Sequence, residues 1–363
     1  MKQLRPEIDA FLSRGLERGD FPGAAIRIEQ RGELLVESAA GVTSIGPHGK
    51  PATPKTLFDL ASLTKPLATS LLILRRVQQR RLSLTGRLGE VVRRFEGTPA
   101  GGATIRQLLT HSSGLPAWDP VYLFGSGRRS FDRRLQELAG QAEKPGTRVV
   151  YSDPGYMILG RLLESFQKAK IDSLFRREIA RPLALGSIGF NPSASRGSIA
   201  ATERRNLWEK RMCEERGFRF VSPSIRDSPG IVNDLNSRAL GGAAGHAGLF
   251  GDAEAVARIT RVFLGDDPEL LSPRLARRAS GDQTSRFQEG RGFGWRTGRG
   301  AAAVRGILGD DSFGHEGFTG TSVWCDRGSG RIAVFLTNRI HPLARPIDFQ
   351  TIRREFHEIA FRS

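Results

Sequence analysis

Strand-like segments lie at both ends of this 363-residue chain, and a long helical stretch separates them. Near the N-terminus, residues Ala24–Glu29 and Glu33–Ser38 are strand-like and are joined at Arg31-Gly32, a pattern typical of a hairpin. Near the C-terminus, Ser322–Asp326 and Arg331–Thr337 form a second such pair around a glycine-containing turn. We therefore expect strands from both ends to build one domain with an antiparallel sheet.

Helical patterns flank these strands and fill the middle of the chain. The first 19 residues place apolar side chains on one helical face, namely those of Leu4, Ile8, Phe11, Leu12 and Leu16. Residues Ile347–Phe361 repeat this pattern at the other end, and residues 62–190 are mostly helical with Leu-rich amphipathic segments. The sequence therefore predicts an α+β fold, in which an antiparallel sheet is flanked by N- and C-terminal helices and interrupted by an inserted, mostly helical region.

These patterns also predict how the chain is divided. Residues 1–61 and 246–363 are expected to form a discontinuous α/β domain, and residues 62–190 a helical region. Residues 191–245 lack clear periodicity and are rich in Ser, Asn, Gly and Arg, so we expect a loop-rich segment over the cleft between the two parts.

Charge, cysteines and hydropathy narrow the class of protein. The net charge of +17 comes from arginines spread through the whole chain, without a basic tail, zinc finger or aromatic RNA-binding motif, so no specific nucleic-acid partner is expected. Met1–Gly19 has no apolar core of a signal peptide, and no run is long enough to span a membrane, which favours the cytoplasm. Cys213 and Cys325 are expected to be reduced thiols, and no metal site or other cofactor is expected.

The first chemical motif is Ser62-Leu63-Thr64-Lys65, followed by Pro66 and a Leu-rich amphipathic stretch. Proline is tolerated only in the first turn of a straight helix, so the helix should begin near Ser62 or Leu63. Its free N–H groups would then favour negative charge developing at the Ser62 hydroxyl. Lys65 lies one turn further on the same face, and a buried lysine with a lowered pKa could take the serine proton. Alone, this motif fits an N-cap serine and a surface lysine equally well.

Two further motifs follow along the chain. Tyr151-Ser152-Asp153 stands just before an apolar helix, where a phenol near lysines could relay protons, although a packing tyrosine would fit too. His315-Glu316-Gly317-Phe318 precedes the strand Thr321–Asp326, and its glycines would let a substrate approach backbone N–H groups closely. An edge strand there could bind an extended acyl chain and contribute to an oxyanion hole.

In this order, the three motifs resemble those of the serine β-lactamase and penicillin-binding-protein superfamily, and the resemblance runs from about residue 23 to residue 338. It implies the β-lactamase/transpeptidase-like fold and assigns Ser62 as the nucleophile, with Lys65 and Tyr151 as the pair that accepts and relays its proton. It further implies that the N–H groups of Ser62 and Phe318 form the oxyanion hole. His315 would take the place of the lysine in the third motif.

Two departures from the family pattern bear on the substrate. Asp153 stands where many members have asparagine, and an ionised aspartate accepts hydrogen bonds without donating any. His315-Glu316 replaces Lys-Thr, so the attraction for a β-lactam carboxylate is weaker. Both changes favour the esterase-like and peptidase-like branches over efficient β-lactam hydrolysis.

A glycine-rich stretch from Asp234 to Phe250 resembles a hallmark of one hydrolase subgroup, some of whose members are linked to muropeptide turnover. His246 could bind a substrate carboxylate or assist the deacylating water. Alternatively, it caps a buried turn while Asp234 ties the loop to an arginine. His111 is expected to be structural and to fix the loop around Ser112-Ser113-Gly114.

The leading hypothesis is therefore a serine hydrolase that acts on a small ester or on a D-amino-acid, muropeptide-type amide. The alternatives are a β-lactamase and a non-catalytic protein that keeps the fold and binds an anionic polymer through its positive charge. The sequence does not fix an oligomeric state.

Overall fold

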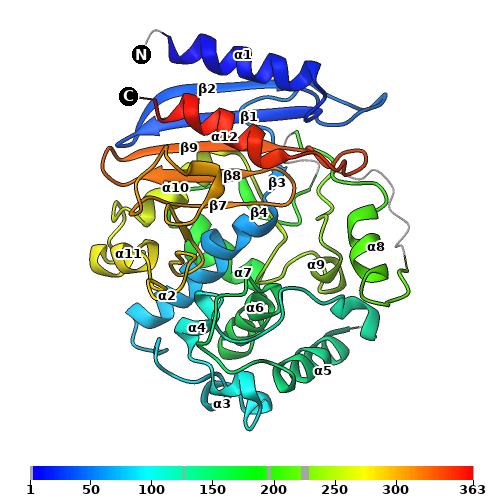
Figure 1. Ribbon diagram of the computed structural model, residues 1–363, viewed down its shortest axis with the longest axis vertical. Coiled ribbons are helices and arrows are strands. Elements are labelled where there is room, and N and C mark those ends of the chain that lie inside the picture. Colours follow the sequence, from blue (N-terminus) through cyan, green and yellow to red (C-terminus); the bar gives the residue numbers. More distant parts are fainter. Residues whose placement is uncertain (1–2, 126, 194–197, 222–228, 363) are drawn as a thin grey trace.

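A six-stranded antiparallel sheet brings the two ends of the chain together in the computed structural model, which describes residues 3–125, 127–193, 198–221 and 229–362 (Figure 1). Its strands, in spatial order, are β2 (Glu33–Gly41), β1 (Gly23–Gln30), β9 (Arg331–Thr337), β8 (Ser322–Asp326), β7 (Phe313–Glu316) and β6 (Arg296–Thr297). Both predicted hairpins are present, and they join where β1 pairs with β9. The predicted α+β fold is confirmed.

Both faces of the sheet are buried. Helices α1 (Leu4–Glu17) and α12 (Phe349–Ala360) cover one face, where Phe335 packs against Phe11 and Phe356 (Figure 1). Neighbouring residues of β9 point the other way and join the larger core of the helical region, as for Ile332, Val334 and Leu336. Because successive side chains alternate between two buried faces, this strand is an almost continuous apolar run.

The remaining helices form the rest of the molecule, with α10 against the second face of the sheet (Figure 1). They are α2 (Leu71–Gln78), α3 (Leu88–Val91), α4 (Ile105–Leu109), α5 (Gly127–Gly140), α6 (Asp153–Gln167), α7 (Ile171–Phe175), α8 (Leu207–Glu214), α9 (Leu235–Ala239), α10 (Ala253–Val262) and α11 (Pro273–Ser280). A small second sheet has the order β3 (Phe58–Asp59), β5 (Leu249–Gly251), β4 (Ile188–Phe190). It connects the segment before Ser62 to the segment after His246.

The stretch 191–245 was expected to consist of loops, and its described part also contains the two short helices α8 and α9. Helix α8 buries Glu209 and Cys213 on one side, a pattern too short and too polar to be recognised as amphipathic. Residues 194–197 and 222–228 of this stretch lie outside the described residues.

Cys213 and Cys325 are both buried and free, as expected. Within the described residues, no helix has the length and apolar character needed to cross a membrane.

Candidate active site

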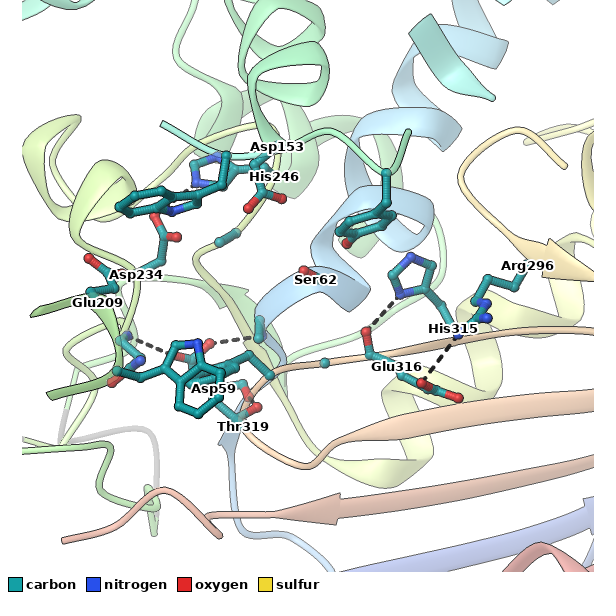
Figure 2. Close-up of a pocket in the computed structure, with 18 of the residues that line it drawn as sticks. Asp59, Ser62, Asp153, Glu209, Asp234, His246, Arg296, His315, Glu316 and Thr319 are labelled. Atoms are coloured by element: carbon teal, nitrogen blue, oxygen red, sulfur yellow. Dashed lines mark hydrogen bonds and ion pairs between the residues drawn. The ribbon is translucent and has the colours of Figure 1, made fainter. Parts of the chain in front are cut away.

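A cavity of about 620 Å³ contains most of the residues that the sequence singled out. Figure 2 shows Ser62 near its middle, with Asp234 and Glu209 on one side and His315 and Arg296 on the other. Other lining residues come from every part of the chain: Asp59, Trp118, Tyr151, Asp153, Trp208, Met212, Asn233, His246, Glu289, Arg291, Glu316, Gly317, Phe318, Thr319, Arg339 and Arg353.

Ser62 lies in a sharp turn at the start of a helix, as predicted. Ala61 has a φ of +46°, a left-handed conformation that is unusual for a residue with a side chain, and its N–H donates to Asp59 Oδ1 at 2.9 Å. The chain continues through a 3₁₀ turn (Ala61–Leu63) and a π-helical segment (Lys65–Ser70) into α2. The Ser62 N–H thus belongs to a first helical turn, where backbone donors have no intrahelical acceptor.

Lys65 is fully buried and connects three parts of the site. Its Nζ donates to Ser62 Oγ at 2.8 Å and to the carbonyl oxygen of His246 at 3.1 Å, and it pairs with Asp153 Oδ1 at 2.7 Å. Burial alone lowers the pKa of Lys65, but the charges of Asp153 and Tyr151 outweigh burial, so the pKa is raised. The expectation of a lowered lysine pKa was therefore wrong, because Asp153 supplies a counter-charge that asparagine would not.

Tyr151 is held by the segment around His111. The N–H groups of Val150 and Ser152 donate to the His111 carbonyl oxygen (2.8 Å) and to His111 Nδ1 (3.0 Å), and the rings of His111 and Tyr151 are 4.5 Å apart. Burial lowers the pKa of His111 well below its usual value, so the ring stays neutral and can accept this bond. The Tyr151 hydroxyl is buried, and Lys65 Nζ lies 4.8 Å from the ring centre. His111 was expected to be structural; the structure adds that it positions Tyr151.

His315 lies at the end of β7, and its ring centre is 5.8 Å from that of Tyr151. Its Nδ1 donates to the Glu316 carbonyl oxygen at 2.9 Å, while Nε2 is buried without a partner. Burial, reinforced by the charges of Lys65 and Arg291, lowers the pKa of His315 well below its usual value. The imidazole is therefore neutral, with an acceptor nitrogen in the cavity.

The free strand edge near the site belongs to β7 and not to the strand that follows it. Strand β8 is interior, because it pairs with both β7 and β9. Strand β6 pairs only with Phe313 and Gly314 of β7. Among the described residues, no strand pairs with His315 and Glu316 on the side of β7 that faces away from β8. An extended substrate segment would have room alongside them.

Gly317 brings the third motif against the Ser62 turn. Its N–H donates to the Thr321 carbonyl oxygen at 2.7 Å, and its own carbonyl accepts from Arg353 at 2.6 Å, so both backbone groups are already used. An added Cβ would stand 2.2 Å from Thr321 Oγ1 and 2.8 Å from the Leu60 carbonyl oxygen. The absence of a side chain at Gly317 is what lets the third motif pack against Leu60 and Ala61, the two residues before Ser62.

Gly317→Ala is expected to destabilise the fold by about 1–3 kcal/mol through overpacking and to lower kcat/KM by about 10²-fold through displacement of the Ser62 turn. Thermal unfolding and ester hydrolysis measure the two effects. Gly102→Ala is the matched control, because its Cβ would meet no atom within 4 Å. Equal behaviour of the two variants would contradict the close approach described here.

Asp234 and His246 contact each other in the cavity wall. His246 Nε2 lies 2.8 Å from Asp234 Oδ1, and the same carboxylate caps α9 by accepting from the Ser237 N–H. Burial raises the pKa of Asp234, but His246 more than offsets this, so the pKa falls below its usual value. Asp234 thus contacts a histidine, while the arginine that the structural alternative expected, Arg238, acts on it through its charge.

Several lining residues carried no sequence signal. Trp208 and Glu209 lie on α8, and Arg291 and Arg296 lie in a segment without a motif. Arg291 pairs with Glu289 at 2.5 Å, and Arg296 lies 3.3 Å from Glu289 and 3.5 Å from Glu316. Only the tertiary fold brings these residues to the site.

The model of the Beta-lactamase family matches residues 8–355 of this chain. The chain belongs to the β-lactamase family. Among curated proteins it is 27% identical over 379 aligned residues, covering 93% of this chain and 84% of the relative, to a Salmonella agona protein named "Putative D-alanyl-D-alanine carboxypeptidase".

Solved structures of this family share the fold at low sequence identity. EstCE1, described as a hydrolase with promiscuous acyltransferase activity, aligns with a TM-score of 0.72 at 22% identity, over 97% of this chain and 99% of EstCE1. A class C β-lactamase mutant aligns with a TM-score of 0.73 at 14% identity, over 97% and 96% of the two chains. This member of the β-lactamase family therefore shares its fold with a hydrolase and with a class C β-lactamase.

Proposed function

We propose that this protein is a serine hydrolase that forms an acyl-enzyme on Ser62 and cleaves a small ester or a D-amino-acid, muropeptide-type amide. The observation that carries the proposal is the contact of Ser62 Oγ with the buried Lys65 Nζ, beside Tyr151 and open to the cavity. A screen of short acyl esters, D-amino-acid peptides and a chromogenic cephalosporin, against wild type and Ser62→Ala, tests it. The names of the carboxypeptidase and EstCE1 relatives support both substrate classes.

In the proposed acylation, Ser62 Oγ attacks the substrate carbonyl carbon and its proton passes to the Lys65–Tyr151 pair. The carbonyl oxygen becomes an oxyanion that accepts hydrogen bonds from the N–H groups of Ser62 and Phe318. When the tetrahedral intermediate collapses, the leaving group takes a proton from the Lys65–Tyr151 pair. The neutral His315 Nε2 can orient the leaving group during this transfer. Water then attacks the carbonyl carbon of the acyl-enzyme ester and gives a proton to the Lys65–Tyr151 pair. The bond between this carbon and Ser62 Oγ breaks, Oγ takes the proton back, and the acyl group leaves as a carboxylic acid.

The charge of Lys65 gives this mechanism a pH dependence. In the structure Lys65 donates to Ser62 Oγ, so the Lys65–Tyr151 pair must lose a proton before it can accept one. We therefore expect kcat/KM to rise from mildly acidic to alkaline pH.

Asp153→Asn is expected to move this rise to lower pH. Asp153 is the largest of the influences that raise the pKa of Lys65, ahead of Tyr151. Its removal should therefore lower this pKa, so that the neutral amine appears at lower pH. The pH profile of kcat/KM for an ester measures the shift, with the exposed Asp310→Asn as control. A profile that stays in place or moves to higher pH would contradict the role given to Asp153.

Chromogenic cephalosporins are expected to be hydrolysed more slowly than short esters. A β-lactam carboxylate would meet the negative Asp153 and Glu316 and a neutral His315, while Arg291 and Arg296 already pair with glutamates. Comparison of kcat/KM values tests this. A cephalosporin that is cleaved far faster than every ester and D-peptide would favour the β-lactamase alternative.

A further inference from the structure

Carboxyl groups gather at one end of the cavity. Asp59, Glu209 and Asp234 all line it, and Figure 2 shows Glu209 beside Asp234, on the opposite side of Ser62 from His315. Each comes from a different segment: the end of β3, helix α8, and the residue before α9.

These carboxyl groups repel one another, since Asp234 raises the pKa of both Asp59 and Glu209, although the charge of Lys65 also acts on Asp234. His246 pairs with Asp234, and the buried Arg238 faces Glu209, Asp59 and Asp234 together. Burial raises the pKa of Asp59 to about 6, and burial with the charge of Asp234 raises that of Glu209 well above its usual value. Of the three, Glu209 therefore most favours its protonated form, and an added positive charge could displace that proton.

Two oxygen atoms at this end have no hydrogen-bond partner. Glu209 is 7% exposed, and its Oε1 accepts from the Leu235 N–H at 3.1 Å while Oε2 is buried and unpartnered. Asn233 is 5% exposed, and its Oδ1 is also buried and unpartnered. Both residues line the cavity. Asn233 Oδ1 is an acceptor, and Glu209 Oε2 becomes one when its carboxyl group is ionised. Buried acceptors are costly to leave unpaired, so a donor brought by a ligand would bind them favourably.

An apolar wall adjoins these acceptors. Trp208 is 40% exposed and its ring centre is 5.9 Å from that of Phe318, and Trp118 and Met212 also line the cavity. This wall could hold a small aliphatic side chain next to a positive group. Among the described residues, no group of three or more His, Cys, Asp and Glu side chains is placed to hold a metal ion. An ammonium group would supply both the N–H donors and the positive charge that the carboxyl groups attract.

We propose that this end of the cavity is a subsite for an ammonium group on the acyl part of the substrate. The inference rests on the proposed function of Ser62. In the proposed mechanism Tyr151 and His315 protonate and orient the leaving group, so the leaving group must lie on their side of Ser62. The acyl part of the substrate then extends to the other side, toward Glu209, Asn233 and Asp234. The preferred substrates are then esters or amides of amino acids with a free α-amino group. With a peptide substrate, the enzyme would release the residue at the amino end.

The test compares the phenyl esters of alanine and of N-acetylalanine, each as D and L enantiomers, at a pH where the amine is charged. Wild type should favour the free amine in kcat/KM by about 10-fold or more, in line with hydrogen bonds to charged groups. Glu209→Gln keeps the acceptor for Leu235 and should bring this ratio close to one. Glu214→Gln, on the exposed side of the same helix, should leave the ratio unchanged.

An inhibition measurement on the wild-type protein tests the subsite even if Glu209→Gln does not fold. Alaninamide should competitively inhibit wild-type hydrolysis of the N-acetyl ester, and N-acetylalaninamide should inhibit it at least about 10-fold more weakly. Equal rates for the two esters, a preference for the acetylated one, or an unchanged ratio in folded Glu209→Gln would overturn the subsite while leaving the hydrolase intact. Failure of every ester, together with an unreactive Ser62, would instead overturn the proposed function.

Discussion

Ser62→Ala is expected to lower kcat/KM by about 10⁴-fold or more for every substrate that the wild-type enzyme hydrolyses. The proposed mechanism forms a covalent bond to Ser62 Oγ, and Lys65 Nζ, 2.8 Å from that atom, belongs to the proposed proton relay. The half-buried alanine should leave the fold intact, because Ser62 contributes one side-chain hydrogen bond at a cavity surface.

The control is Ser83→Ala, at an exposed serine outside the cavity, which should keep wild-type rates. Thermal unfolding of both variants separates a lost nucleophile from a lost fold. If folded Ser62→Ala kept most of the activity, another residue would be the nucleophile. The same result would revive the alternative of a binder that keeps the fold without using this chemistry.

Lys65→Ala and Tyr151→Phe are each expected to lower kcat/KM by about 10² to 10⁴-fold, the range of general-base contributions. Tyr151→Phe is the cleaner test, because it removes only the hydroxyl and keeps the ring between His111 and Lys65. Lys65→Ala also removes the partner of Asp153 and so should lower thermal stability as well as activity.

Tyr122→Phe is the matched control for Tyr151→Phe, since the Tyr122 hydroxyl lies 3.4 Å from Cys213 Sγ and outside the cavity lining. Steady-state kinetics with one activated ester and one D-peptide would show whether the loss is in kcat. Near-wild-type rates in both Lys65→Ala and Tyr151→Phe would rule out the proposed proton relay.

Local sequence patterns predicted those parts of the site that depend on neighbours in the chain. Pro66 indicated where the helix begins, and the three-residue spacing placed Lys65 on the same face as Ser62. Alternating strand residues and the glycine-containing turns predicted both hairpins and the sheet that joins the chain ends.

Properties set by distant segments could not be predicted in this way. The raised pKa of Lys65 depends on Asp153, which folding brings within 2.7 Å. The His246–Asp234 contact and the position of Glu209 depend on how the stretch 191–245 packs against the cavity. That stretch has too little periodicity for sequence alone to show its helices. The division into domains and the cytoplasmic location remain predictions from the sequence.

The most direct test of the account is the intact mass of the protein after reaction with a fluorophosphonate, followed by peptide mapping. The account predicts a single phosphonyl addition, located on the peptide that contains Ser62, and no addition to Ser62→Ala under the same conditions. An unmodified Ser62 in active enzyme, or equal labelling of Ser62→Ala, would contradict it.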